Sequence, residues 1–335
     1  MSGDFARAFG FRATDDGLEQ AYLASKMVLD SRAGGAMYPI AGIFGTPATD
    51  LVAVERLIRR ARDFGYSGVT VMHPTHVTVA NNVYRPTAEE VAYFEGLIAA
   101  FEAAEKAFSA KDYATALTQY ETALKAEPDN MRYASQYRMA IMAQAKALHP
   151  KEGMPADYDR SIKFFESLTA EHPTAAIAQL NLGFAHVDKM PAAGAITQVI
   201  TANTALSFFT KSIDARPTWL GYYTRGNSYL FWPKIFNRAQ LGVNDLEAAY
   251  KLQKAGPNKP YYVRAYISLG DGYWKTDQLD KAKALWKEGL ALFPNSAALK
   301  DRVAKDGDDL KMTIEDTLDP NKRVDTDLKE LWSNP

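Results

Sequence analysis

Residues 266–294, with the sequence YISLGDGYWKTDQLDKAKALWKEGLALFP, decide the fold of most of this chain. Gly270 in the first half and Ala282 in the second are small residues that allow two helices to approach closely. Trp286 is large enough to fill the space toward a neighbouring helix pair. Pro294 ends the second helix, because proline has no amide hydrogen to donate. The stretch therefore predicts two packed helices that form one unit of a repeating structure.

The same spacing of small and large residues recurs upstream of this stretch. Two copies have identical offsets, namely Tyr113, Ala116, Tyr120, Ala123 and Pro128, and then Tyr158, Ser161, Phe165, Leu168 and Pro173. Two further copies are less regular and carry insertions at residues 190–203 and 232–238. A period of about 34 residues is typical of helical solenoids. The chain resembles tetratricopeptide repeat (TPR) proteins, and we expect a TPR α-solenoid of about five helix pairs over residues 97–302.

In solenoids of this kind the first helices of the pairs line a concave groove, which implies that a protein or peptide partner binds there. The residues near groove-facing positions are polar or aromatic: Asn181, Tyr223, Asn227, Arg264 and Asp271. For each of them, an ordinary solvated position is the alternative. The two insertions are further candidates, because their aromatic residues have no role in the repeat. Local packing is the alternative for these residues, which are Phe231, Trp232 and Phe236.

The first hundred residues follow a different pattern, in which helices alternate with apolar runs. Helical periodicity covers residues 18–35 and 50–64, and the apolar runs are AMYPIAGIFG at 36–45 and SGVTVMHP at 67–74. Apolar runs that alternate with helices are typical of β-α-β units. We therefore expect about two parallel strands in this part of the chain.

Four motifs in this part resemble one enzyme family. They are GDF at residues 3–5, RARDFGYSG at 60–68, MHPTH at 72–76 and NNVYRPTAEEV at 81–91. Residues 3–105 resemble the carboxy-terminal portion of the HpcH/HpaI aldolase and citrate lyase β-subunit-like family. The resemblance implies a truncated (β/α)8 barrel, of which this chain holds the last two strands. It also implies a carbon–carbon lyase that uses Mg²⁺ on an acyl-CoA or 2-oxo acid substrate.

By this resemblance Asp4 stands at the position of a metal-binding aspartate. The second carboxylate ligand, a glutamate, and the arginine that binds the substrate carboxylate belong to strands upstream of this sequence, so we expect an incomplete site. A complete barrel needs about 250 residues. His73 follows the second strand, where barrel enzymes place functional groups, and it is a candidate catalytic residue. The alternative is that His73 and Pro74 only shape the loop.

Composition limits the remaining functions. The 39 basic and 40 acidic residues give a net charge of −1, so we expect no nucleic-acid partner. The chain has no cysteine, which excludes disulfides and thiolate metal sites. We expect no membrane partner, since no stretch reaches the roughly 18 consecutive apolar residues of a membrane-spanning helix. The first residues lack the apolar core of a secretory signal, so a cytoplasmic location is expected.

The sequence thus predicts three parts: an aldolase fragment at 1–96, the TPR solenoid at 97–302, and a capping helix or charged tail at 303–335. In the tail, Leu328, Leu331 and Trp332 are expected to cover the last repeat.

The favoured hypothesis is a protein-interaction scaffold that carries a catalytically incomplete aldolase fragment, inactive alone. The alternative is a Mg²⁺-dependent lyase whose barrel is completed by another chain or by domain swapping. In that case the N-terminal fragment associates with a second copy or with a complementing barrel half. A third hypothesis is that the N-terminal fragment folds poorly and has no role.

Overall fold

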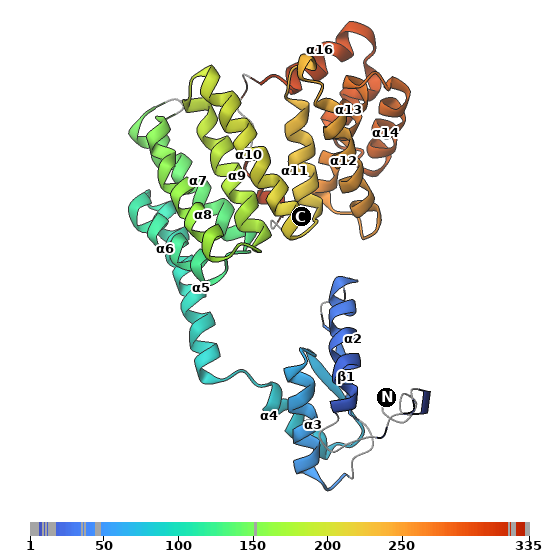
Figure 1. Cartoon of the computed structure of the whole chain (residues 1–335). Helices are drawn as coiled ribbons and strands as arrows, with labels where there is room; N and C mark the ends of the chain where they lie inside the picture. The colour runs from blue at the N-terminus through green and yellow to red at the C-terminus, as the bar shows by residue number, and fades with distance from the viewer. Residues whose placement is uncertain are drawn as a thin grey trace. The chain divides into compact units, whose positions relative to one another are not determined.

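The computed structural model describes residues 7–8, 10, 12, 18–34, 36, 38–43, 48–150, 153–320, 322 and 326–331 (Figure 1). The chain divides into two compact units, Met1–Phe94 and Glu95–Pro335. The boundary falls within one continuous helix, α5, which runs from Ala88 to Ser109. Residues 85–87, which are not helical, precede α5.

The N-terminal unit contains a parallel pair of strands with a helix between them. Ile40 pairs with Gly68 at one end of the sheet, and Ile43 pairs with Val71 at the other. Within the described residues each strand pairs only with the other one. The prediction of two parallel strands is confirmed. The elements of this unit are η1 Leu18–Gln20, α2 Ala21–Ala33, β1 Ile40–Ile43, α3 Leu51–Asp63, β2 Gly68–Val71 and α4 Thr75–Tyr84.

Helix α3 connects the two strands. Its sequence is strongly amphipathic, so that one face can pack against them. Its N-terminus is capped by Asp50, whose side chain accepts a hydrogen bond from the amide of Ala53 at 3.0 Å. Val54 and Ile58 lie one turn apart and are fully buried, in the same cluster as Ile43 of β1. This burial holds the β-α-β unit together.

The second unit is a stack of five helix pairs, α5/α6 to α13/α14, followed by two shorter helices (Figure 1). The predicted mainly helical solenoid is confirmed. The bounds of its helices are α5 Ala88–Ser109, α6 Tyr113–Ala126, α7 Met131–Leu148, η2 Pro155–Tyr158, α8 Asp159–Glu171, α9 Ala176–Lys189, η3 Met190–Ala192, α10 Ala195–Ala215, α11 Trp219–Leu230, η4 Lys234–Phe236, α12 Ala239–Lys254, η5 Pro260–Tyr262, α13 Val263–Lys275, α14 Leu279–Leu292, α15 Ala297–Ala304, α16 Gly307–Thr317 and η6 Lys329–Leu331.

One large aromatic residue anchors the second helix of four of the five pairs. Tyr120, Phe165, Phe209 and Trp286 occupy equivalent positions in α6, α8, α10 and α14, and none is more than 1% exposed. Burial of a side chain of this size contributes roughly 2 to 3 kcal/mol. The aromatic positions in the sequence pattern that predicted the repeats are therefore the largest residues in the core of the stack.

Glycine in the first helix makes room for this aromatic residue. A Cβ added at Gly270 would lie 2.0 Å from Nε1 of Trp286, and one added at Gly183 would lie 2.4 Å from the ring of Phe209. Both distances are far below van der Waals contact. The two helices of each of these pairs can approach only because the first one carries no side chain at this point.

The insertion at residues 190–203 is mostly helical. After the short η3 turn it forms the first turns of α10, which has 21 residues where α6 has 14. The insertion at 232–238 contains η4 and turns at Asn237, which has a φ of 50°. Within it, Trp232 is buried rather than exposed, whereas Phe236 is 52% exposed.

The C-terminal part contains a cap and a separate segment. Helix α16 covers the end of the stack with Leu310 and Ile314, which are buried in the same cluster as Trp286. Leu328 does not cover the last repeat as predicted, because it is buried against α9 and α10 in the middle of the stack. Leu331 packs against that same cluster. Trp332 lies outside the described residues.

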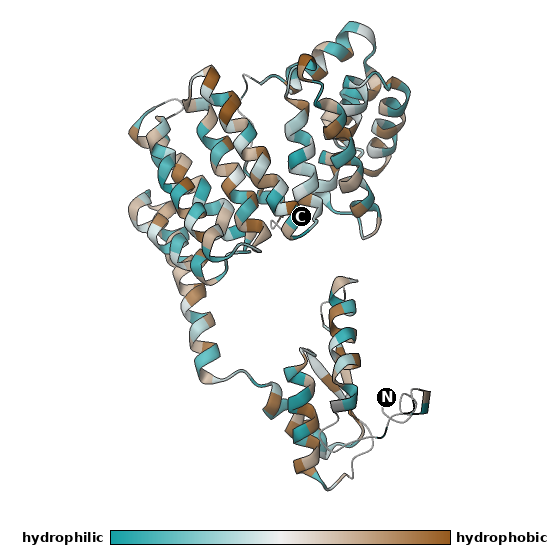
Figure 2. Ribbon diagram, viewed as in Figure 1, coloured by the Kyte–Doolittle hydropathy of each residue, from teal (hydrophilic) through white to brown (hydrophobic). Residues whose placement is uncertain are grey.

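The helices of the stack carry hydrophobic and hydrophilic residues side by side, so none is apolar on all its faces (Figure 2). This pattern is typical of helices that bury one face and expose another to water. In the described part of the chain, no helix is long and apolar enough to span a membrane.

We predict that Gly270→Ala destabilises the repeat stack by about 1 to 3 kcal/mol, the usual cost of overpacking a core. Trp286 is fully buried and has no space into which to move. Urea denaturation followed by circular dichroism measures the loss. Gly256→Ala is the control, because no atom lies within 4 Å of a Cβ added there. Equal midpoints for the two variants would contradict the prediction.

Candidate functional site

A cavity of about 360 Å³ opens among helices α9, α10 and α11 in the middle of the stack. Both insertions contribute to its lining, through the first turns of α10 and through the loop that contains η4. Its wall is mainly apolar and includes Phe184, Val187, Leu206, Phe209, Trp232 and Leu328. The cavity is therefore a place where an apolar side chain or ligand loses contact with water.

Three of the predicted groove residues line this cavity: Tyr223, Asn227 and Arg264. The ring of Tyr223 stacks on that of Trp219, with centroids 4.9 Å apart and an interplanar angle of 3°. The side-chain oxygen of Asn227 accepts a hydrogen bond from Ser268 at 2.9 Å. These contacts fix the orientation of the polar groups that border the apolar wall.

The other two predicted groove residues are buried and have internal partners. Asp271 is fully buried and accepts two hydrogen bonds of 2.6 Å from Arg302 of α15. Its side chain therefore ties the last repeat to the cap. Asn181 is also fully buried and accepts a hydrogen bond of 2.9 Å from Arg138. Neither side chain is free to contact a partner, because the helices around it are packed too closely.

A buried arginine on α7 is the centre of a polar network beside the cavity. The Arg138 side chain has no exposed surface, and its guanidinium lies 2.7 Å from a carboxylate oxygen of Asp188, which is itself 3% exposed. The guanidinium also lies 4.7 Å from the centre of the Phe184 ring. Two ions this deeply buried are stable only if every polar atom has a partner.

The last of these partners comes from the C-terminal end of the chain. We call residues 326–331 the tail segment. The backbone oxygen of Thr326 accepts a hydrogen bond of 3.1 Å from Arg138, and its hydroxyl donates to Asp188. Leu328, 5% exposed, enters the apolar cluster of the cavity. Glu330 then forms an ion pair with Arg264 of α13. The tail segment thus spans the first helices of several repeats.

Arg138 and Asp188 are not among the predicted site residues. One signal was available: Arg138 lies among the apolar residues of RYASQYRMAIMAQA (132–145), at a position where the helix faces its neighbour. An arginine on a buried helix face needs an acidic partner. Sequence alone does not say which carboxylate that is, since Asp188 lies 50 positions away.

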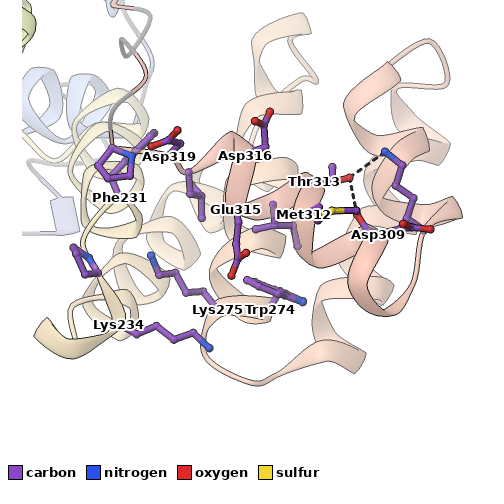
Figure 3. Close-up of a pocket in the computed structure, with 15 residues that line it drawn as sticks. Phe231, Lys234, Trp274, Lys275, Asp309, Met312, Thr313, Glu315, Asp316 and Asp319 are labelled. Carbon is purple, nitrogen blue, oxygen red and sulfur yellow. Dashed lines mark hydrogen bonds between the residues drawn. The ribbon is translucent and has the colours of Figure 1, made fainter.

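A second and larger hollow, of about 940 Å³, lies between the loop at 231–234, α13 and α16 (Figure 3). Lys275 extends into it and donates to the backbone oxygen of Trp232 at 2.9 Å. Burial, together with the nearby Lys234, lowers the pKa of Lys275. Across the hollow, Lys305 donates to Thr313 at 3.0 Å. Because its lining mixes both signs of charge with apolar side chains, the hollow favours no single ligand class.

In the N-terminal unit, His73 follows β2 and begins the turn into α4. Its Nδ1 lies 2.8 Å from the hydroxyl of Thr75 and accepts from the amide of Thr75 at 3.3 Å. These contacts support the interpretation that His73 shapes the loop. His76 is 1% exposed, and neither of its ring nitrogens has a hydrogen-bond partner.

Asp4, the metal-binding candidate, lies outside the described residues. Among the residues that the structure describes, no group of three or more histidine, aspartate or glutamate side chains could hold a metal ion.

Comparison with known proteins identifies a relationship for part of the chain. The mitochondrial citramalyl-CoA lyases of Rattus norvegicus and Homo sapiens are each 30% identical to it over 105 residues. The aligned region is 29% of this chain and 28% of each lyase, so the chain spans little more than a quarter of the length of these relatives. The resemblance to citrate lyase-like enzymes is thus confirmed for one segment. No family model matches the chain.

Solved structures align with a larger part of the chain. A thermophilic TPR protein from Thermus thermophilus aligns with 62% of this chain and 97% of its own, at a TM-score of 0.42 and 19% identity. The MamA protein aligns with 64% of this chain and 97% of its own, at a TM-score of 0.39 and 17% identity.

We predict that Asp188→Asn destabilises the stack by about 3 kcal/mol or more, because it leaves the charge of Arg138 buried without a counter-ion. Urea denaturation measures the loss. Asp159→Asn is the matched control: Asp159 pairs with Lys189 at 2.7 Å but is 45% exposed, so its loss costs less than about 1 kcal/mol. Losses of similar size for the two variants would show that the Arg138 network contributes no more than a surface pair.

Proposed function

We propose that this chain is a protein-interaction scaffold that binds a peptide segment of its partner in the groove beside the cavity. One observation carries the proposal: the groove already holds a peptide, the tail segment of the chain itself. Leu328 supplies an apolar side chain to the cavity, and the flanking Thr326 and Glu330 supply polar contacts. An apolar anchor with polar flanks is the usual arrangement of a peptide-binding site.

The dimensions of the cavity support a peptide. Its volume of about 360 Å³ is near the lower end of the range of roughly 300 to 1,000 Å³ for sites that enclose a small molecule. It suits one or two apolar side chains better than a large cofactor. Asn227 and Arg264 at its border provide the polar contacts that fix the direction of a bound chain.

We expect Val199→Glu to reduce binding of groove-dependent partners at least tenfold. Val199 lines the cavity from α10 and is 48% exposed, so a glutamate there places a charge at the entrance without disturbing the core. The measurement is capture by the immobilised full chain with quantitative mass spectrometry. The control is Ile200→Glu on the same helix, which is 62% exposed and outside the cavity lining. A partner set that is the same for both variants would refute the groove as the binding site.

A second function is favoured by a specific observation, the 30% identity to citramalyl-CoA lyases over 105 residues. The matched length is close to that of residues 3–105, which carry the family motifs. We propose that these residues derive from the end of such a lyase barrel, with β1 and β2 as its last two strands. Completion by another chain or by swapping between copies would then be required for activity.

We predict no cleavage of citramalyl-CoA by the purified chain in the presence of Mg²⁺, because only one of the implied carboxylate ligands, Asp4, is in the sequence. Release of the CoA product, followed spectrophotometrically, tests this. Turnover that needs Mg²⁺ and disappears in Asp4→Ala would favour the lyase function instead. Turnover that persists in Asp4→Ala would point to a contaminating enzyme.

A further inference from the structure

The tail segment contacts the groove through both backbone and side-chain groups. At its start Thr326 is 3% exposed and bonds to the buried pair formed by Arg138 and Asp188. At its end the η6 turn contacts η5 (Pro260–Tyr262), next to α13. Between them Leu328 packs in the apolar cluster and forms part of the wall of the cavity. Each of these three contacts is made to a different part of the stack.

These contacts define which chemical groups a peptide needs in order to bind in the groove. The hydrogen bond from Arg138 to the backbone oxygen of Thr326 requires a peptide carbonyl that is not already bonded within a helix. The cluster around Phe184, Phe209 and Trp232 requires an apolar side chain two residues later. Arg264 requires a carboxylate two residues after that. The spacing corresponds to the sequence Thr326-Asp-Leu328-Lys-Glu330.

We propose that the groove recognises peptides that carry a leucine followed two residues later by a carboxylate, and that the tail segment is its built-in competitor. The inference rests on the proposed function and names the partner chemistry and the regulation of the same site. A partner peptide of this type displaces the tail segment before it binds. The affinity of the full chain for such a peptide is thus lower than that of the open groove.

The competition is strong because the tail segment is tethered. A ligand joined by a short connection has an effective concentration of about 1 mM at its site. The apparent dissociation constant of a competing peptide rises as the fraction of molecules with an open groove falls. A tail segment that occupies the groove in about nine molecules of ten or more weakens the competitor about tenfold or more.

The test measures binding of a fluorescein-labelled synthetic peptide with the sequence of residues 323–335 (RVDTDLKELWSNP) to the full chain by fluorescence anisotropy. In the chain, Leu328→Asp places a carboxylate against the apolar cluster and releases the tail segment. We expect the peptide to bind this variant at least tenfold more tightly than the unmodified chain. Leu252→Asp, at a leucine of α12 that is 43% exposed, is the control and leaves the affinity unchanged.

A second set of variants tests whether the carboxylate of Glu330 holds the tail segment in place, and it does not depend on Leu328. Glu330→Lys in the chain turns the ion pair with Arg264 into a repulsion, and we expect a tighter peptide complex again. In the double variant Glu330→Lys and Arg264→Glu the pair is restored with opposite signs, so the groove closes. A labelled peptide with lysine in place of its glutamate, whose charge suits the Arg264→Glu groove, therefore binds this variant weakly. Circular dichroism melts of every variant show whether the stack is still folded.

Two outcomes would overturn the inference. Equal affinity of the peptide for the unmodified chain and for both tail variants would show that the tail segment does not compete. Unchanged binding of a peptide with lysine in place of its glutamate would show that Arg264 does not select a carboxylate. Neither result bears on whether Val199→Glu reduces partner capture, so the proposed function is tested separately.

Discussion

The structure depends on one steric constraint, the contact between a glycine of the first helix and an aromatic ring of the second. Where Gly270 meets Trp286 and Gly183 meets Phe209, any Cβ would overlap the ring. The aromatic residue is fully buried as a result, and it also fixes the distance between the helices of its pair. Since each pair packs on the next, this local distance is carried along the whole stack.

The insertions modify this regular stack where the cavity forms. Lengthening of α10 to 21 residues extends it beyond the helix it packs against, and the loop after α11 brings Trp232 into the same cluster as Phe209. The cavity thus forms where the structure departs from the regular repeat, and core residues of the repeat form its wall. Its apolar character follows from this origin, whereas its polar border comes from the neighbouring first helices, through Asn227 and Arg264.

The polar network next to the cavity has an energetic role that differs from that of the core. A buried ion pair such as Arg138 with Asp188 gives little net stability over an apolar pair, yet it strongly penalises any arrangement that leaves one charge unpaired. The network therefore favours one specific position of the tail segment, whose Thr326 completes the hydrogen bonds of both charged groups. The ion pair of Glu330 with Arg264 is about one-third exposed and adds less.

The sequence by itself determined the helix pairs and the parallel strands, because both depend on residue spacings that are local in the chain. Tyr113 to Pro128 and Leu279 to Pro294 share the same offsets, and such a pattern needs no knowledge of distant contacts. Only the tertiary structure decided that Asn181 and Asp271 are internal, that Trp232 is buried, and where Leu328 packs. Those outcomes depend on which residues meet after folding. Arg138 and Thr326, for example, are 188 positions apart, and no periodicity connects them. A short segment without a repeat can pack wherever its few side chains find partners, so its place is set by the completed surface of the stack.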